Sequence, residues 1–242
     1  MKENQDGRNQ MLIFDLDGTL YSGDDPYRFY AQEVSLTMNS QTAHHYLQTV
    51  EDHLNGIQES LVSGDNWEAV VRLAQPYLTD DLRIQAAFLA TRQYMLSTAC
   101  HLEIPPGLQE HLKKWREKAY LTVATNSPES ASFPLLDKLG LSSFFDLIRA
   151  DTHKPEGLLD LVQVHPLGKE LPVQHIISVG DNYTNDIVPA LHAGWKTVHL
   201  SPRGHFPGPA TLQVKNLESA FQVIDQWLAG GTQQEDEGRS IS

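Results

Sequence analysis

Five short apolar runs, each ending in polar residues, are the feature that most restricts the fold of this 242-residue chain. Helical patterns lie between them: Leu108, Leu112 and Trp115 recur at helical spacing, and Gly140 is placed to cap another helix at its C-terminus. Alternating strands and helices predict a parallel sheet covered by helices on both faces. The predicted strands are residues 12–17, 120–126, 145–151, 176–182 and 196–201.

Residues 21–103 interrupt this alternation, because their apolar residues recur at helical spacing throughout. Proline and glycine near both ends, at 24–26 and 104–107, indicate two hinges. We therefore predict an α/β core of residues 1–20 and 104–230, an inserted helical domain of residues 21–103, and a disordered polar tail, 231–242. The helices expected in the insertion are residues 27–38, 42–61, 67–74 and 81–99.

The composition limits the cellular compartment and the classes of binding partner that we expect. The formal net charge of −13 opposes binding to nucleic acid, which usually depends on clustered Lys and Arg. Cys100 is the single cysteine and cannot form an internal disulfide, which suits a reducing cytoplasm. The polar start of the chain resembles neither a signal peptide nor a membrane span. A small phosphorylated ligand is compatible with the negative charge, since a bound cation overrides repulsion at short range.

Residues 15–19 read Asp-Leu-Asp-Gly-Thr and directly follow the apolar run 12–14, where a central strand is expected to end. Ligands of open parallel sheets bind at that edge. Two carboxylates one residue apart in a strand point to opposite faces, so both reach one site only if the chain bends at once, which Gly18 permits. One carboxylate can then attack phosphorus while the other protonates the leaving oxygen and later activates water.

Three further motifs follow in order along the chain. Residues 123–127 read Val-Ala-Thr-Asn-Ser at the end of a predicted strand, Lys154 precedes Pro155, and residues 180–186 read Gly-Asp-Asn-Tyr-Thr-Asn-Asp. Together the four motifs resemble the signature of the haloacid dehalogenase (HAD) superfamily. The resemblance covers residues 11–20 and 104–202, whereas the insertion is similar to HAD caps only in position and helicity.

The resemblance implies a Rossmann-like α/β core and a catalytic role for three residues. Asp15 is expected to be the nucleophile that forms an aspartyl-phosphate, and Asp17 to be the general acid and base. Lys154 is expected to place an ammonium group beside the phosphate and the nucleophile. The residues expected to bind the substrate are Thr19, Thr125, Asn126 and Lys154.

The resemblance also implies a magnesium site. The expected ligands are the carboxylate of Asp15, the main-chain carbonyl of Asp17, and the acids Asp181 and Asp186, bound directly or through water. Such an oxygen-only set suits Mg²⁺.

Simpler structural interpretations exist for some of these residues. Thr125 and Asn126 could merely precede a helix, with Ser127 before Pro128 as its N-cap. The arginines of the insertion are expected mostly on solvated helix faces. They are Arg28, Arg72, Arg83 and Arg92.

Several reactions occur in the superfamily, so the fold cannot decide the chemistry. Asp17 argues against a dehalogenase, because a halide leaves without a proton. Residues 21–103 contain no lysine, which removes the cap lysine expected of phosphonate hydrolases and of phosphoglucomutase relatives. We therefore expect a magnesium-dependent phosphatase for a small phosphorylated metabolite, acting as a monomer or homodimer away from membranes and nucleic acid. The alternatives are a catalytically inactive HAD-like module that senses phosphate or binds a protein, and another HAD reaction such as phosphoglucomutase.

Overall fold

The computed structural model describes residues 7–57, 65–78, 80–164 and 171–230. The chain divides into two compact units: a core unit of Met1–Tyr21 with Ile104–Ser242, and an inserted unit of Ser22–Glu103. The tail predicted to be disordered, 231–242, and the predicted helix end at Leu61 lie outside the described residues.

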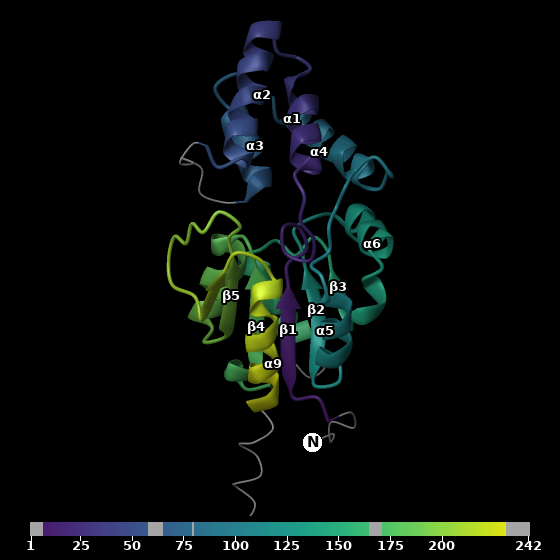
Figure 1. Cartoon of the computed structure of the whole chain (residues 1–242), viewed down its shortest axis with the longest axis vertical. Coiled ribbons are helices and arrows are strands. Elements are labelled where there is room, and N and C mark those ends of the chain that lie inside the picture. The colour runs from purple at the N-terminus through teal and green to yellow at the C-terminus, as the bar shows by residue number, and fades with distance from the viewer. Residues whose placement is uncertain (1–6, 58–64, 79, 165–170, 231–242) are drawn as a thin grey trace, which may run out of the picture. The chain divides into compact units, whose positions relative to one another are not determined.

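The core unit is built on a six-stranded sheet with the strand order β3-β2-β1-β4-β5-β6 (Figure 1). All neighbouring strands are parallel. β1 lies at the centre, where Phe14 is paired with both Val123 and Val179. The strand order reverses beside β1, and ligands of open α/β sheets bind at such a switch point. The strands are β1 Gln10–Phe14, β2 Ala119–Ala124, β3 Leu147–Arg149, β4 Ile176–Gly180, β5 Lys196–Leu200 and β6 Leu212–Val214.

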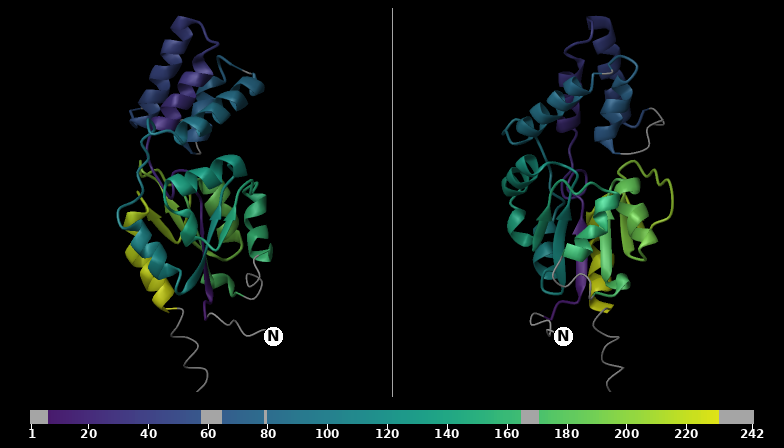
Figure 2. Two further views of the ribbon diagram at one scale, coloured as in Figure 1. Left: turned by 90° about the vertical axis from the view of Figure 1, so that its right-hand side faces the viewer. Right: turned by 180° about the vertical axis from the view of Figure 1, so that it is seen from behind.

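Helices cover both faces of this sheet, which confirms the predicted fold class. On one face Met11 and Ile13 of β1 join an apolar cluster with Leu161 of α7. On the other, Phe14 stacks on Trp115 of α5 with ring centroids 6.0 Å apart. Figure 2 shows α5 and α9 side by side on that second face. The helices are α5 Leu108–Trp115, α6 Glu129–Lys138, α7 Asp160–Val164, α8 Val188–His192 and α9 Phe221–Gly230.

The five predicted strands are all present, and each ends earlier than predicted because its last polar residues leave the sheet. Gly140 follows α6 with a φ of +67°, as its predicted cap role requires, and the N–H of Leu141 donates to the carbonyl of Leu136 over 2.9 Å. Strand β6 and helix α9 were not predicted.

The described residues of the inserted unit form four helices in the places predicted from sequence, but three of the helices end earlier than predicted, at Ser35, Leu54 and Met95. Three of the four begin at a side-chain cap, supplied by Asn39, Asp65 and Asp80. Buried tyrosine and aliphatic side chains, among them Tyr30 and Tyr46, form a core of its own. The helices are α1 Asp25–Ser35, α2 Ser40–Leu54, α3 Asn66–Ala74 and α4 Asp81–Met95.

One arginine of the inserted unit departs from the expected solvated position. Arg92 is only 5% exposed, and its guanidinium lies 4.6 Å from the ring centroid of Trp67 and 5.0 Å from that of Phe88. Cation–π attraction to these rings offsets part of the cost of its burial. By contrast, Arg28 forms an ion pair of 2.9 Å with Glu51 at the surface.

The two ends of the inserted unit are paired with each other. Ser22 and Glu103 exchange main-chain hydrogen bonds of 2.9 Å in both directions, as an isolated antiparallel bridge. Close by in sequence, Asp25 accepts a 3.0 Å hydrogen bond from the N–H of His101. Among the described helices of the whole chain, none is both long and apolar enough to cross a membrane.

Candidate active site

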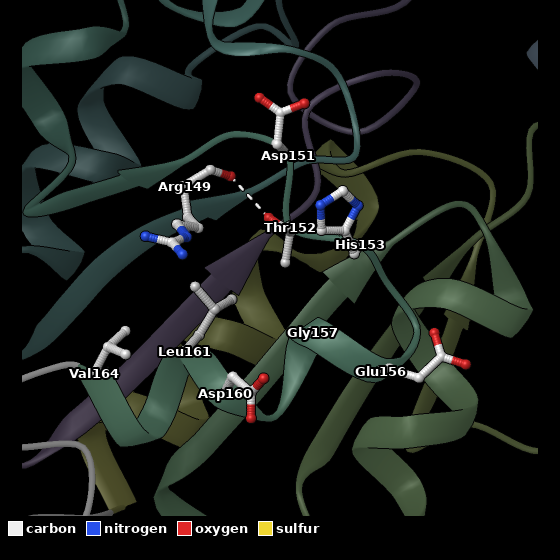
Figure 3. A pocket seen from close by; sticks show the side chains of 9 residues that line it. All are labelled: Arg149, Asp151, Thr152, His153, Glu156, Gly157, Asp160, Leu161 and Val164. Carbon is white, nitrogen blue, oxygen red and sulfur yellow. Dashed lines mark hydrogen bonds between the residues drawn. The ribbon is translucent and has the colours of Figure 1, made fainter.

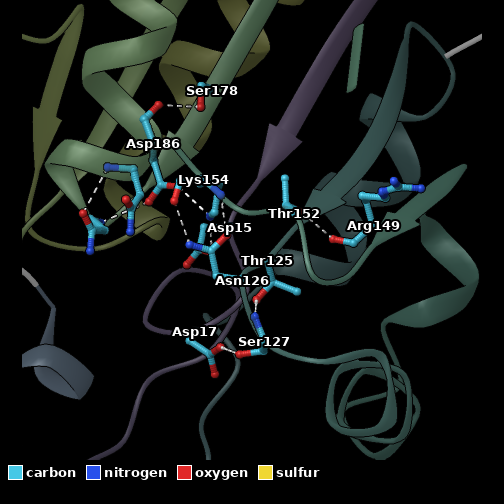
Figure 4. Close-up of polar contacts among 12 residues, drawn as sticks. Asp15, Asp17, Thr125, Asn126, Ser127, Arg149, Thr152, Lys154, Ser178 and Asp186 are labelled. Carbon is cyan, nitrogen blue, oxygen red and sulfur yellow. Dashed lines mark hydrogen bonds and ion pairs between the residues drawn. The ribbon is translucent and has the colours of Figure 1, made fainter. Parts of the chain in front are cut away.

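Polar residues that follow β1, β2 and β4 gather at the carboxyl edge of the sheet (Figure 4). The N–H of Asp15 donates to the carbonyl of Val179 over 2.9 Å, so Asp15 continues the pairing of β1 with β4. The N–H of Thr125 likewise donates to the carbonyl of Arg149 over 3.0 Å. Parallel strands therefore bring residues of the first, second and fourth motifs to one edge.

Lys154 joins two of the predicted acids. Its Nζ lies 2.6 Å from Oδ1 of Asp15 and 2.6 Å from Oδ1 of Asp186, and its side chain is 3% exposed. Burial raises the pKa of Asp15 to about 7, helped by Asp186 and Asp17 and opposed by Lys154. Burial would lower the pKa of Lys154, but the two carboxylates raise it overall, so Lys154 stays a cation.

Three carboxylates could hold a metal ion together. One oxygen each from Asp15, Asp181 and Asp186 lie within 4.8 Å of one another. Oxygen donors at such spacing fit a hard divalent cation. When all three acids are ionised, they and the ammonium group carry an excess of two negative charges, which a divalent ion would balance. The donor set therefore fits Mg²⁺, and the carboxyl group of Asp17 does not belong to this cluster.

Two glycines allow the acids to approach the strands so closely. Gly18 has a φ of +79°, and a Cβ there would overlap the carboxylate of Asp181. A Cβ on Gly180 would overlap the carboxylate of Asp186. The bend predicted at Gly18 is therefore present, and it makes room for an acid as well as turning the chain.

The side chain of Asp17 lies between two hydroxyl groups. Tyr21 donates a hydrogen bond to Oδ1 of Asp17, and Ser127 donates one of 2.7 Å to Oδ2. The alternative role of Ser127 as an N-cap is wrong, because α6 begins later, at Glu129, and the N–H of Glu129 donates to Asp151 Oδ2 over 3.2 Å.

Asn126 holds the main chain of Lys154 at two points. Its Oδ1 accepts the N–H of Lys154 over 2.6 Å, and its Nδ2 donates to the carbonyl of Lys154 over 3.0 Å. The loop before Lys154 contains two residues in the left-handed region, Asp151 with a φ of +46° and His153 with a φ of +56°. Such strained backbone persists where surrounding contacts fix it, so Asn126 secures the position of Lys154.

The two threonines differ in their contacts. Thr125 is buried and its Oγ1 accepts the N–H of Ser127 over 3.1 Å, which leaves its proton to donate elsewhere. Thr19 is buried too, and among the described residues its hydroxyl has no hydrogen-bond partner. Substrate contacts of Thr19, Thr125 and Asn126 stay predictions.

Sequence reasoning missed the residues that support the acids. Beyond Tyr21 and Ser127, His199 of β5 is 2% exposed, and its Nε2 donates to the carbonyl of Asp181 over 3.2 Å. Burial lowers the pKa of His199, so the ring stays neutral near pH 7. A histidine inside an apolar strand carries no signal of such a contact in the sequence.

A cavity of about 310 Å³ lies beside the loop that leads to Lys154 (Figure 3). None of the predicted catalytic or metal-binding acids lines it. It is therefore distinct from the cluster around Asp15. Its lining residues are Arg149, Asp151, Thr152, His153, Glu156, Gly157, Asp160, Leu161 and Val164.

Comparison with known protein families shows to which family the chain belongs. The model of the haloacid dehalogenase-like hydrolases matches residues 10–194, more than half of the chain. The chain belongs to this family. It is thus a HAD hydrolase, as the four motifs predicted. Among curated proteins, none matches the sequence.

Solved structures of HAD proteins share the fold at low sequence identity. The HAD hydrolase YfnB of Bacillus subtilis, solved with magnesium bound, has a TM-score of 0.61 at 18% identity, covering 90% of this chain and 99% of that one. A predicted phosphoglycolate phosphatase of Haemophilus somnus has a TM-score of 0.62 at 20% identity, covering 89% and 97%. A 2-haloacid dehalogenase of Pseudomonas syringae has a TM-score of 0.53 at 18% identity, covering 90% and 99%. Since phosphatases and dehalogenases both occur among them, the fold leaves the reaction to the site.

Proposed function

We propose that this HAD hydrolase is a magnesium-dependent phosphatase that hydrolyses a small phosphomonoester through an aspartyl-phosphate on Asp15. The observation that carries the proposal is the Lys154 ammonium, which lies 2.6 Å from Oδ1 of Asp15 in a buried site. Phosphoryl transfer asks a protein mainly for positioning and for positive charge around the phosphoryl oxygens. A fixed buried cation beside a carboxylate nucleophile supplies both.

The proposed reaction gives these residues the following tasks. Asp15 attacks phosphorus while Asp17 gives its proton to the leaving oxygen, and Asp17 later removes a proton from the attacking water. Lys154 and the Thr125 hydroxyl hold the phosphoryl oxygens. Asp15, Asp181, Asp186 and the carbonyl of Asp17 would hold Mg²⁺, which supplies further positive charge when bound.

The presence of Asp17 favours a phosphatase over a dehalogenase. An alkoxide is a poor leaving group unless it is protonated, whereas a halide ion leaves without a proton. Asp17 has hydrogen bonds to the hydroxyls of Tyr21 and Ser127. A hydroxyl can donate to a carboxylate and accept from a protonated carboxyl group. This chemistry has no use in removing a halide.

The inserted unit is proposed to act as a cap that selects the substrate. Its internal core and its paired ends support this, because it can keep its own fold while the chain bends at the boundaries between the two units. The hinge predicted at 24–26 is wrong, because these residues form the start of α1. The proposed partner is a small phosphorylated metabolite, and nucleic acid and membrane are not proposed as partners. A monomer or a homodimer in the cytoplasm is the proposed state.

The purified protein is expected to release phosphate from 4-nitrophenyl phosphate when Mg²⁺ is present. EDTA should stop the release, and an excess of Mg²⁺ should restore it. Asp17→Asn should lower kcat by about 10²–10⁴-fold, since it removes the acid and base at nearly constant volume. A stable wild-type protein that releases no phosphate from this compound or from a panel of phosphorylated metabolites would refute the proposal and favour a binding module.

Asn126→Ala is expected to lower kcat by about 10- to 100-fold, because a loop shift of about 1 Å at Lys154 misplaces the cation. Asn126→Asp keeps the acceptor for the Lys154 N–H and should lose less. Steady-state kinetics of both variants, with circular dichroism to check folding, would measure this. If both variants raised KM with kcat unchanged, Asn126 would instead be the substrate ligand predicted from sequence.

A further inference from the structure

Two hydroxyl groups hold the side chain of Asp17, and neither takes part in the bond changes of the proposed reaction. The Tyr21 hydroxyl donates to Oδ1, and the Ser127 hydroxyl donates to Oδ2 over 2.7 Å. From this pairing we infer that Tyr21 and Ser127 are positioning residues that fix the direction in which the Asp17 carboxyl group points. The inference rests on the proposed function, in which Asp17 acts on the leaving oxygen.

The two hydroxyls come from different parts of the fold and are fixed there. Tyr21 is 2% exposed and follows Asp17 by four residues, whereas Ser127 is 6% exposed and follows β2. The N–H of Ser127 donates to Oγ1 of Thr125 over 3.1 Å, and its carbonyl accepts the N–H of Asp151 over 3.0 Å. Asp17 is therefore held from two independent directions.

Hydroxyl groups suit a carboxyl group that must gain and lose a proton. A hydroxyl can donate to an ionised carboxylate and can accept from a protonated one. An ammonium group or a main-chain N–H would stabilise only the ionised form, and a carbonyl only the protonated form. The hydroxyls of Tyr21 and Ser127 can therefore keep their hydrogen bonds to Asp17 in both steps of the reaction, without favouring the ionised or the protonated form. A carboxylate offers about four lone-pair sites, so two hydroxyl bonds are compatible with a third bond to the leaving oxygen.

The benefit depends on the leaving group. In the first step Asp15 forms a bond to phosphorus while the bond from phosphorus to the leaving oxygen breaks, and the Asp17 proton moves to that oxygen. In the second, water attacks phosphorus and gives a proton to Asp17 while the bond from phosphorus to Asp15 breaks, which releases phosphate. A basic alkoxide needs the first transfer most and a nitrophenolate needs it least, so misplacing Asp17 should affect alkyl phosphates selectively.

The test compares two substrates in Tyr21→Phe and Ser127→Ala, which remove one hydroxyl each. The quantity is kcat/KM, because it reports the steps up to release of the leaving group. For glycerol 2-phosphate we expect losses of about 10- to 100-fold in each variant, since a catalytic group displaced by about 1 Å costs about that much. For 4-nitrophenyl phosphate the loss should stay under about threefold, because its leaving group needs little protonation.

Matched variants separate chemistry from packing. Threonine and valine have nearly equal volumes, but only threonine keeps a hydroxyl. Ser127→Val should therefore lose activity selectively on glycerol 2-phosphate, and Ser127→Thr should not. Tyr46→Phe removes another buried tyrosine hydroxyl, which donates to the carbonyl of Val70 over 3.1 Å, and should leave both substrates unaffected. Equal losses for both substrates in Tyr21→Phe and Ser127→Val would overturn the inference and leave the phosphatase proposal standing. A wild-type protein inactive on both compounds and on the panel of phosphorylated metabolites would overturn the two together.

Discussion

Replacing Asp15 with asparagine is expected to lower turnover by about 10⁴-fold or more, because removal of a nucleophile that acts in concert with its neighbours costs on this scale. Asn has nearly the volume of Asp but carries no charge to attack phosphorus. The protein should still fold, since the amide fits the same space next to Lys154. Phosphate release and circular dichroism would measure the two effects, and Asp15→Ala would serve as a control for slow deamidation of the asparagine.

The same nucleophile predicts a phosphorylated protein. With labelled substrate and Mg²⁺, rapid acid quenching should leave base-labile, hydroxylamine-sensitive phosphate on the peptide that contains Asp15. Beryllium fluoride with Mg²⁺ should inhibit, as a mimic of that adduct. Direct attack by water would form no adduct. Full activity in Asp15→Asn together with repeated failure to trap phosphate would establish the direct route and a different assignment of the site.

Lys154→Met is expected to lower the free energy of unfolding by about 3–5 kcal/mol, the usual cost of removing one partner from a buried ion pair. Asp15 and Asp186 would then face each other without the ammonium group that lies 2.6 Å from each of them. Turnover should fall by about 10²–10³-fold, as for removal of one group that stabilises transition-state charge.

Added Mg²⁺ should restore part of the lost stability, because a divalent cation neutralises the same carboxylates. Urea unfolding with and without Mg²⁺ would measure both the free energy of unfolding lost in Lys154→Met and the part that Mg²⁺ restores. Lys113→Met provides a matched control on the exposed surface of α5 and should change the unfolding free energy by less than about 0.5 kcal/mol. A Lys154→Met protein as stable as the wild type would show that the cluster around Asp15 does not need this cation.

The strands and the motifs could be read from the sequence because each depends on residues close together in the chain. Alternating apolar runs predict β1 to β5, and the acids of the motifs follow strand ends directly. Strand β6 could not be predicted in this way, since Leu212–Val214 is too short to show a period and owes its form to pairing with β5. Its existence is decided by tertiary contacts.

The contacts that support Asp17 also depend on tertiary structure, so they could not be predicted from the sequence. Ser127 lies 110 positions from Asp17 in the sequence. No local sequence pattern indicates that the Ser127 hydroxyl donates to the Asp17 carboxylate instead of capping α6. Tyr21 was counted with the insertion, although it belongs to the core unit and bonds Asp17. Arg92 was expected in solvent because arginine side chains usually are exposed. Its guanidinium instead contacts the rings of Trp67 in α3 and of Phe88 in its own helix, α4.

The bridge between Ser22 and Glu103 makes the insertion exchangeable. Directly paired antiparallel residues lie about 4.5–5.5 Å apart at their Cα atoms, so the chain leaves the core and returns to it at nearly the same point. A tight hairpin turn spans such a gap, and so does a module of any length whose ends are adjacent. Evolution or an engineer can therefore replace the 22–103 segment with another module without rerouting the strands that carry the acids. The proposed selectivity of the insertion and the proposed chemistry of the core would then be encoded in separable stretches of the same gene.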